Sequence, residues 1–201
     1  MQTEIEAKFL NVDFDAVRKH LTAAGAICDQ PMRLMRRKTY DYPGNRLSDE
    51  YNGWVRVRDE GDKITLSYKQ LNDRTLHGTK EITLTVDDFK AADSFLLAIG
   101  LEQKSYQETK RESWHLGDVQ VELDEWPWIK PTVEIEGPSE TAVREVAEKL
   151  GYNFKDALFG SVEVAYQAEY DVTEDEIDGW EVVTFTPVPE WLEPKRRKVA
   201  V

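Results

Sequence analysis

Alternation of apolar and polar residues is the dominant pattern along this chain. It is regular over six segments, residues 3–10, 54–58, 64–69, 81–86, 119–124 and 132–136. Because successive side chains of a strand point to opposite sides, the alternation predicts strands with one apolar and one polar face. Strand-like composition without so regular an alternation extends to residues 33–42, 105–116 and 181–186.

Helical spacing occurs in three amphipathic stretches, within residues 13–25, 88–100 and 139–151. Each stretch ends at a glycine, the residue that most often terminates a helix. Residues 161–170 form a fourth helical stretch, and Thr-Glu-Asp-Glu at 173–176 has the pattern of a capping box. About eight strands, mostly linked as hairpins, with a few helices predict an α+β protein built on an antiparallel sheet or barrel.

The polar faces of the predicted strands carry sorted charge. Like-charged residues share a face in the pairs Glu4 and Glu6, Arg56 and Arg58, Glu122 and Asp124, and Glu134 and Glu136. Each pair alone fits a solvated outer face, but exposed sheet surfaces usually mix charge signs. Together the pairs favour a barrel whose polar faces line the interior and whose apolar faces pack outward against helices. Such a lumen needs a polyanion and a metal ion to compensate its charges.

Composition narrows the class of protein. The chain has 201 residues, 40% of them hydrophobic, which fits one folded domain with a self-supporting core. No apolar run approaches the ~20 residues of a membrane span, and Cys28 is the single cysteine, so we expect a cytoplasmic protein without a membrane partner. With 26 Lys+Arg against 39 Asp+Glu, the net charge of −13 argues against nucleic-acid binding.

The negative charge is concentrated in the second half of the chain. Residues 1–100 are nearly balanced, whereas residues 163–181 hold eight acidic side chains and no basic one. We expect that stretch to be a solvated helix face and loop outside any site. The basic run at residues 195–198 is expected to be a disordered tail.

The N-terminal Glu4-Ile5-Glu6-Ala7-Lys8 has the form ExExK, which resembles the signature of the CYTH family, or triphosphate tunnel metalloenzymes. Further segments resemble the family's strands in order: TYDYP at 39–43, GWVRVR at 53–58, LSYK at 66–69, KEI at 80–82, TKRE at 109–112, VELDE at 121–125 and VEIEG at 133–137. ExExK alone is short, but the ordered set covers roughly residues 1–170.

The resemblance implies an eight-stranded antiparallel β-barrel, a tunnel with a charged lumen and helices packed outside, over residues 1–170. Residues 171–201 would then form an acidic C-terminal segment with an extra strand at 180–188 and a basic tail. The implied partner is a small triphosphate substrate, bound by a monomer or a homodimer.

The resemblance also assigns roles to the charged residues. The implied substrate-binding residues are Lys8, Arg56, Arg58, Lys69 and Arg111. The implied ligands of one or two Mg²⁺ or Mn²⁺ ions are Glu4, Glu6, Asp124, Glu134 and Glu136. Catalysis would rest on Glu4, Glu6, Lys8, Arg56 and Arg58. Glu81 and Glu122 would line the lumen, and either Arg37 or Lys38 would add a phosphate contact.

These residue types suit phosphate chemistry, because guanidinium groups match phosphate oxygens and carboxylates bind hard cations. The sequence leaves three functions open. The leading one is metal-dependent hydrolysis of inorganic triphosphate, thiamine triphosphate or a nucleoside triphosphate. The others are a class IV adenylyl cyclase, which makes cyclic AMP from ATP, and a non-catalytic binder of polyphosphate or phosphorylated ligands.

Trp126-Pro127-Trp128 has two readings: a turn that closes the strand after Asp124, which we favour, or a platform that stacks on a base or thiamine ring. His20, His77 and His115 lack metal-ligand spacing, and Cys28 belongs to no motif. We expect structural or surface roles for all four.

Overall fold

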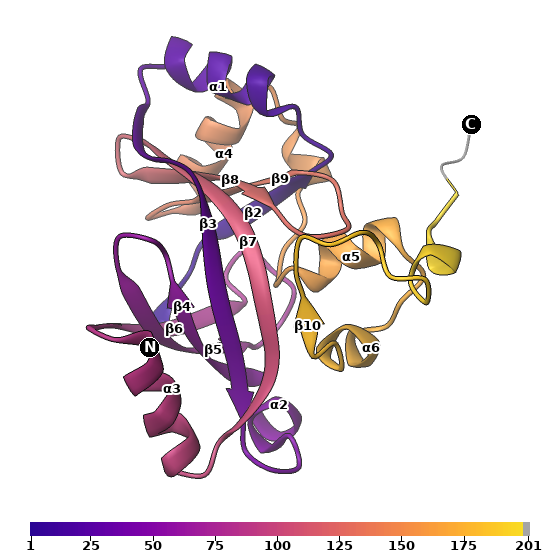
Figure 1. Cartoon of the computed structure of the whole chain (residues 1–201). Coiled ribbons are helices and arrows are strands. Elements are labelled where there is room, and N and C mark those ends of the chain that lie inside the picture. Colours follow the sequence, from indigo (N-terminus) through magenta and orange to yellow (C-terminus); the bar gives the residue numbers. More distant parts are fainter. Residues whose placement is uncertain (199–201) are drawn as a thin grey trace.

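A curled sheet covered by helices forms the body of the protein in a computed structural model that describes residues 1–198 (Figure 1). The strands are β1 (Gln2–Thr3), β2 (Glu6–Leu10), β3 (Ile27–Asp41), β4 (Gly53–Asp59), β5 (Ile64–Leu71), β6 (Thr79–Val86), β7 (Glu102–Leu116), β8 (Val119–Glu125), β9 (Thr132–Glu136) and β10 (Val182–Val183). The α-helices are α1 (Phe14–Ala23), α2 (Arg46–Tyr51), α3 (Phe89–Ala98), α4 (Glu140–Lys149), α5 (Glu163–Glu169) and α6 (Glu174–Asp178). Two 3₁₀ turns lie at Phe154–Asp156 and Glu193–Lys195.

The N-terminal segment brings the two ends of the sheet together. The strand order is β1-β6-β5-β4-β3-β7-β8-β9-β2, with antiparallel pairing throughout this path. β1 and β2 stand at opposite ends of that order, yet only Glu4 and Ile5 separate them in the chain. The Glu4 amide donates to the carbonyl of Thr79, 3.0 Å away, before β2 turns to pair with β9. The predicted α+β tunnel fold with an antiparallel sheet is therefore confirmed, with nine strands on this path in the described chain where eight were expected.

β3 and β7 are both longer than their composition predicts. Each has 15 residues, and they pair along most of their length. The register shifts between Cys28 and Gln30 and again between Gln30 and Arg33, so the start of β3 does not alternate regularly. Pro31, which has no amide hydrogen for the ladder, lies within this irregular stretch. These shifts explain why alternation alone missed the beginning of β3.

The apolar faces of the strands point outward, against the helices. Ala7 of β2, Val121 of β8 and Ile135 of β9 are fully buried in one core with Leu21 of α1 and Val143 of α4. A second core forms on the same outer face over other strands, where Val57 of β4 and Tyr40 of β3 cluster with Ala92 and Leu96 of α3. The arrangement leaves the polar faces on the inside, which confirms the inverted packing inferred from the charge pattern.

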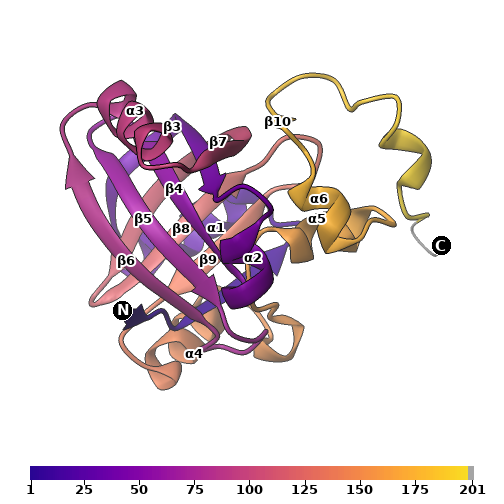
Figure 2. The same ribbon diagram turned by 90° about the horizontal axis from the view of Figure 1, so that it is seen from below.

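Residues 161–198 form a third cluster at the side of the sheet away from α3, as the two views together show (Figures 1 and 2). Its buried members include Tyr166, Tyr170 and Trp180. β10 pairs in parallel with β7 at Tyr106 and Gln107, just beyond the part of β7 that pairs with β8.

Residues 195–197 of the basic run contact the rest of the protein and do not extend from it as a disordered tail. The Arg196 guanidinium lies 4.6 Å from the Tyr170 ring centroid, and Arg197 Nε donates to the Gln167 carbonyl at 2.8 Å. Among the helices of the described chain, none is long and apolar enough to cross a membrane.

Ile135→Ala tests the outward-facing core. Ile135 is fully buried between β9 and the helices, so the substitution should lower the free energy of unfolding by roughly 2–5 kcal/mol. Ile82→Ala, on β6 where the side chain is 46% exposed, is the matched control and should change it by less than about 0.5 kcal/mol. Urea denaturation measures both; equal losses would contradict the assignment of faces.

Candidate functional site: a charged tunnel

The inward faces of the strands line a cavity of about 1510 Å³. Nine of the ten predicted site residues line it: Glu4, Glu6, Lys8, Arg56, Arg58, Lys69, Arg111, Glu134 and Glu136. Asp124 is 1% exposed and lies beneath Arg111, which donates to its two carboxylate oxygens from Nε and Nη2. None of His20, His77, His115 or Cys28 is among the lining residues, as their lack of a motif predicted.

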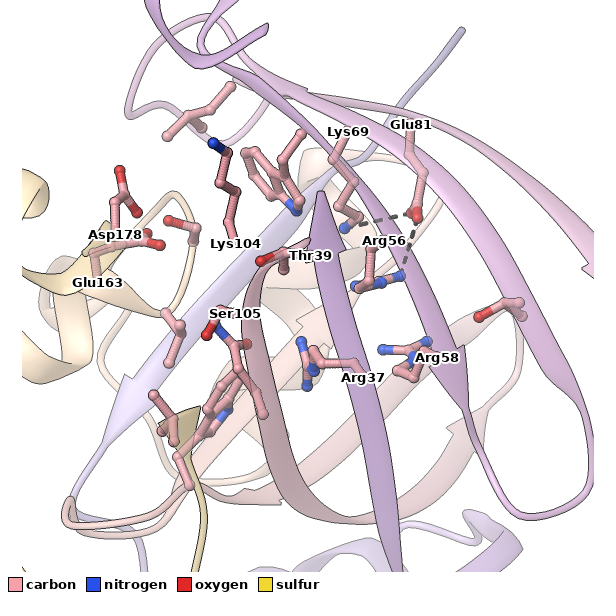
Figure 3. Close-up of a pocket in the computed structure, with 18 of the residues that line it drawn as sticks. Arg37, Thr39, Arg56, Arg58, Lys69, Glu81, Lys104, Ser105, Glu163 and Asp178 are labelled. Carbon is pink, nitrogen blue, oxygen red and sulfur yellow. Dashed lines mark hydrogen bonds and ion pairs between the residues drawn. The ribbon is translucent and has the colours of Figure 1, made fainter. Parts of the chain in front are cut away.

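Three arginines converge in the middle of the cavity, as Figure 3 shows for Arg37, Arg56 and Arg58. Arg37 faces Arg58 across β3 and β4, and Arg56 lies two residues before Arg58. Arg37 and Arg56 are 8% and 7% exposed, and the Nε atom of each has no hydrogen-bond partner within residues 1–198. Buried cations with unpaired donors form a site that an anion would complete.

The electrostatics of the two buried arginines agree with this geometry. Burial and then the neighbouring cations, beginning with Arg56, place the pKa of Arg37 well below the usual value. Burial and the nearby Arg58 likewise lower the pKa of Arg56 to about 10, although Glu81 opposes the shift. The causes shared by the two residues are burial first and then the positive charge of neighbouring arginines.

Of the neighbours Arg37 and Lys38, only Arg37 faces the cavity. Arg37 points into the cavity with Arg56 and Arg58. Lys38 points to the outer face, where its Nζ lies 2.7 Å from Asp93 of α3. The register of β3 against β4 therefore assigns the cavity position to Arg37.

Lys8 and Arg111 of the cavity are held by carboxylates. Lys8 Nζ lies 2.9 Å from Glu6 and 3.3 Å from Glu134, and Arg111 Nη2 lies 2.8 Å from Glu134. Burial opposes the charge of Lys8, but the two carboxylates outweigh it and raise its pKa. Without a ligand, these cations and carboxylates neutralise one another. A polyanion that enters the tunnel could accept hydrogen bonds from the same lysine and arginine side chains.

Three carboxylates of the lumen lie on β2, on β9 or just before β2. Glu6 and Glu136 are cross-strand partners on β2 and β9, and Glu4 lies two residues before Glu6. Burial and a hydrogen bond with Glu81 raise the pKa of Glu4 to about 8, although Lys69 lies only 3.0 Å away. Burial and the charge of Glu6 also raise the pKa of Glu136. A divalent cation would relieve this repulsion.

Within residues 1–198, no three carboxylate, histidine or cysteine side chains converge as a preformed metal cluster. Lys8 and Lys69 hold Glu6 and Glu4 as ion pairs. The donor set nevertheless suits a hard divalent cation, which prefers carboxylate oxygens. Glu122 adds a buried Oε2 atom with no hydrogen-bond partner in the described chain.

Sequence reasoning missed Glu60, which holds Arg58 in place. Its Oε1 accepts from Arg58 Nη2 at 2.6 Å and from Thr65 Oγ1 at 2.9 Å, and the residue is 5% exposed. Burial acts against ionisation, but Arg58 and Thr65 lower the pKa of Glu60 to about 2. Glu60 lies just beyond the end of β4, where strand alternation carries no information.

The expectation that residues 163–181 lie outside the site was wrong. Glu163 and Asp178 point toward the cavity from the C-terminal segment (Figure 3), and Glu174, Asp175 and Glu181 also line it. Burial and the charge of Asp178 raise the pKa of Glu163 to about 7. The acidic stretch surrounds part of the cavity because β10 ties it to the edge of β7.

Comparison with known proteins identifies the family: the chain belongs to the CYTH domain family, whose model matches residues 2–158. This family binds triphosphate substrates, includes triphosphatases and adenylyl cyclases, and uses divalent metal ions. No curated protein matches the chain in sequence.

Solved structures share the fold at low sequence identity. A candidate adenylate cyclase from Vibrio parahaemolyticus is 16% identical with a TM-score of 0.70, covering 83% of this chain and 98% of that one. The PH1012 protein from Pyrococcus horikoshii is 20% identical with a TM-score of 0.63, covering 77% and 93%. A candidate adenylyl cyclase from Hippeastrum, described as having a dominant triphosphatase activity, is 14% identical with a TM-score of 0.56, covering 82% and 95%.

Glu4→Gln tests the protonated carboxyl of the lumen. The pKa of Glu4 rises from 4.5 to about 8 on folding, so the folded state binds the extra proton between these values. The stability that this proton contributes is complete below about pH 4.5 and is lost as the pH rises through 8. The free energy of unfolding of wild type, relative to Glu4→Gln, should fall by ~1 kcal/mol or more from pH 5 to pH 8.

The measurement is urea denaturation of both proteins across this pH range, in buffer that contains a metal chelator. A difference between the two proteins that does not change with pH would contradict the shifted pKa.

Proposed function

We propose that this protein hydrolyses the terminal phosphate of a small triphosphate inside the tunnel, with Mg²⁺ or Mn²⁺ as the metal. The observation that carries the proposal is the pair of buried arginines, Arg37 and Arg56, whose Nε atoms are unpaired in the described chain, with Arg58 beside them in the same cavity. A polyanion supplies the acceptors that these donors lack. The family's triphosphate substrates make this anion a triphosphate.

In this proposal the cations bind the phosphate chain from several strands. Arg37, Arg56 and Arg58 contribute guanidinium donors, which match phosphate oxygens in pairs. Lys8, Lys69 and Arg111 line the same cavity and already share their donors with carboxylates. A triphosphate that accepts from them would compete with those carboxylates and release them for a metal ion.

Glu4, Glu6 and Glu136 would hold the metal, with Glu134 beside them on β9. The bound metal would neutralise phosphate charge and orient and acidify the attacking water. Asp124 remains a candidate ligand from the family resemblance, although in its present position it fixes Arg111.

The arrangement suits phosphoryl transfer, which depends mainly on positioning and charge neutralisation and needs no protein nucleophile. Arg56 and Arg58 would stabilise the charge that develops on the transferred group, and Lys8 would neutralise the phosphate next to Glu6. Glu60 would keep Arg58 oriented, because it accepts from both Nε and Nη2 of that side chain.

The adenylyl cyclase alternative uses the same tunnel, with the ribose 3′-hydroxyl in place of water and pyrophosphate as the leaving group. The candidate cyclase from Vibrio parahaemolyticus has a similar fold, with a TM-score of 0.70, which supports this alternative. Glu136 disfavours the non-catalytic binder, since it lines the lumen without an ion pair among the described residues and so is available to a metal ion.

A product assay separates these functions. Purified protein with Mg²⁺ or Mn²⁺ is offered tripolyphosphate, thiamine triphosphate and ATP, and phosphate, pyrophosphate and cyclic AMP are resolved. Release of phosphate supports the proposal, whereas cyclic AMP with pyrophosphate from ATP supports the cyclase. Turnover of none of the three substrates would overturn both enzymatic functions and favour the binder.

Neighbouring residues of β3 provide a matched test of the anion site. Arg37→Ala and Arg56→Ala should lower kcat/KM for the active substrate by roughly a hundredfold or more, because each removes a buried donor to phosphate. Arg36→Ala removes an arginine whose side chain is 50% exposed on the outer face and should leave kcat/KM unchanged. Equal effects at Arg36 and Arg37 would contradict the site.

Alanine at Glu4 or Glu6 should abolish metal-dependent turnover while tripolyphosphate binding is retained, because the cations remain. Steady-state assays over a metal titration, with calorimetry for binding, measure the two properties separately. Turnover at wild-type rate in either variant would count against the carboxylates as the metal site.

A further inference from the structure

Arg37 is a buried arginine of the site, and no carboxylate of the described chain forms an ion pair with it. Its Nη2 donates to Thr109 Oγ1 at 3.1 Å, its Nε is unpaired, and no ion pair of residues 1–198 includes it. Arg56, in contrast, lies 3.2 Å from Glu81, and Arg58 lies 2.6 Å from Glu60. Something other than a counter-ion must therefore hold the Arg37 side chain in the lumen.

The indole ring of Trp126 supplies that support. The Arg37 guanidinium carbon lies 4.3 Å from the Trp126 ring centroid, within the range of a cation–π contact. Trp126 follows directly after β8, lines the cavity and is only 6% exposed. With so little exposed surface, its ring is packed against protein and is not free to stack on the ring of a ligand. The structure thus favours a packing role for Trp126 within the Trp-Pro-Trp turn.

Tyr166 of α5 fixes Trp126 from the other direction. Their ring centroids are 6.4 Å apart in an edge-to-face arrangement, and the Tyr166 hydroxyl donates to the Pro127 carbonyl at 3.0 Å. Tyr166 is 1% exposed and also contacts Trp180 edge to face, at 5.1 Å. A continuous row of aromatic contacts therefore runs from the C-terminal segment to the arginine of the anion site.

We propose that Trp126, held by Tyr166, is a positioning residue for Arg37, so that the C-terminal segment completes the phosphate site. The inference rests on the proposed function for the identity of the anion. It goes beyond that function because Tyr166 and Trp180 lie outside residues 2–158, the part of the chain that matches the family. A stacked guanidinium is oriented before the anion arrives, so less ordering is needed on binding.

Binding of tripolyphosphate in chelator-containing buffer, measured by calorimetry, tests the inference independently of turnover. Trp126→Leu removes the ring and should weaken binding about tenfold, and Trp126→Phe, which keeps a smaller ring, should weaken it less. Trp128→Phe is the matched control: Trp128 belongs to the same turn and contacts Trp180, but it does not stack on Arg37. Its affinity should equal that of wild type.

A double-mutant cycle with Arg37→Met distinguishes positioning from general stability. If Trp126 acts through Arg37, Trp126→Leu should have little further effect on affinity in the Arg37→Met background. Equal losses in both backgrounds, or wild-type affinity of Trp126→Leu, would overturn the inference. If Trp126→Leu does not fold, as its thermal transition will reveal, the same cycle with Trp126→Phe decides the question.

The outcomes separate this inference from the proposed function. Tripolyphosphate binding with a coupled Trp126–Arg37 cycle but no turnover would overturn the hydrolase and support the positioning role. Turnover of a triphosphate without coupling between Trp126 and Arg37 would support the hydrolase and overturn the positioning role. Failure of the wild-type protein to bind tripolyphosphate would overturn the positioning role, and turnover of thiamine triphosphate or ATP would still support the hydrolase.

Discussion

Compensation of charge inside a curled sheet is the constraint on which this structure depends. A buried ion costs several kcal/mol unless it is paired, so the lumen is stable only where cations and carboxylates interleave. Lys8 between Glu6 and Glu134, and Arg111 with Glu134, satisfy that requirement. Arg37 does not, because its contacts are the Thr109 hydroxyl and the Trp126 ring, neither of which carries a negative charge. The proposed anion site is the place where the protein leaves its own charges incompletely compensated.

The same constraint explains why the helices lie outside the sheet. Strands that turn their polar faces inward expose their apolar faces outward, and these faces must be covered. α1 and α4 cover β2, β8 and β9, and α3 covers β4. A register slip of one residue in any of these strands would exchange the two faces, so the tunnel and its helical cover are specified together.

The net charge of −13 describes no single site in this protein. Part of the negative charge neutralises lumen cations through residues such as Glu134 and Glu81. Another part, including Glu163 and Asp178, lines the cavity from the C-terminal segment. The electrostatic potential that a short anion meets inside the tunnel therefore depends on the nearby side chains, and the net charge of the chain does not predict its sign.

The sequence by itself determined the alternation of the strands, the amphipathic helices and which charged residues share a face, because all three depend on residues close together in the chain. Glu4, Glu6 and Lys8, like Arg56 and Arg58, could be grouped in this way. Only the tertiary structure decided which neighbour of a pair enters the lumen, as for Arg37 and Lys38, because Arg36, Arg37 and Lys38 are consecutive cations and give no apolar–polar alternation that would set the register. It alone brought Tyr166 against Trp126, since contacts between residues distant in sequence leave no periodic signal in the chain.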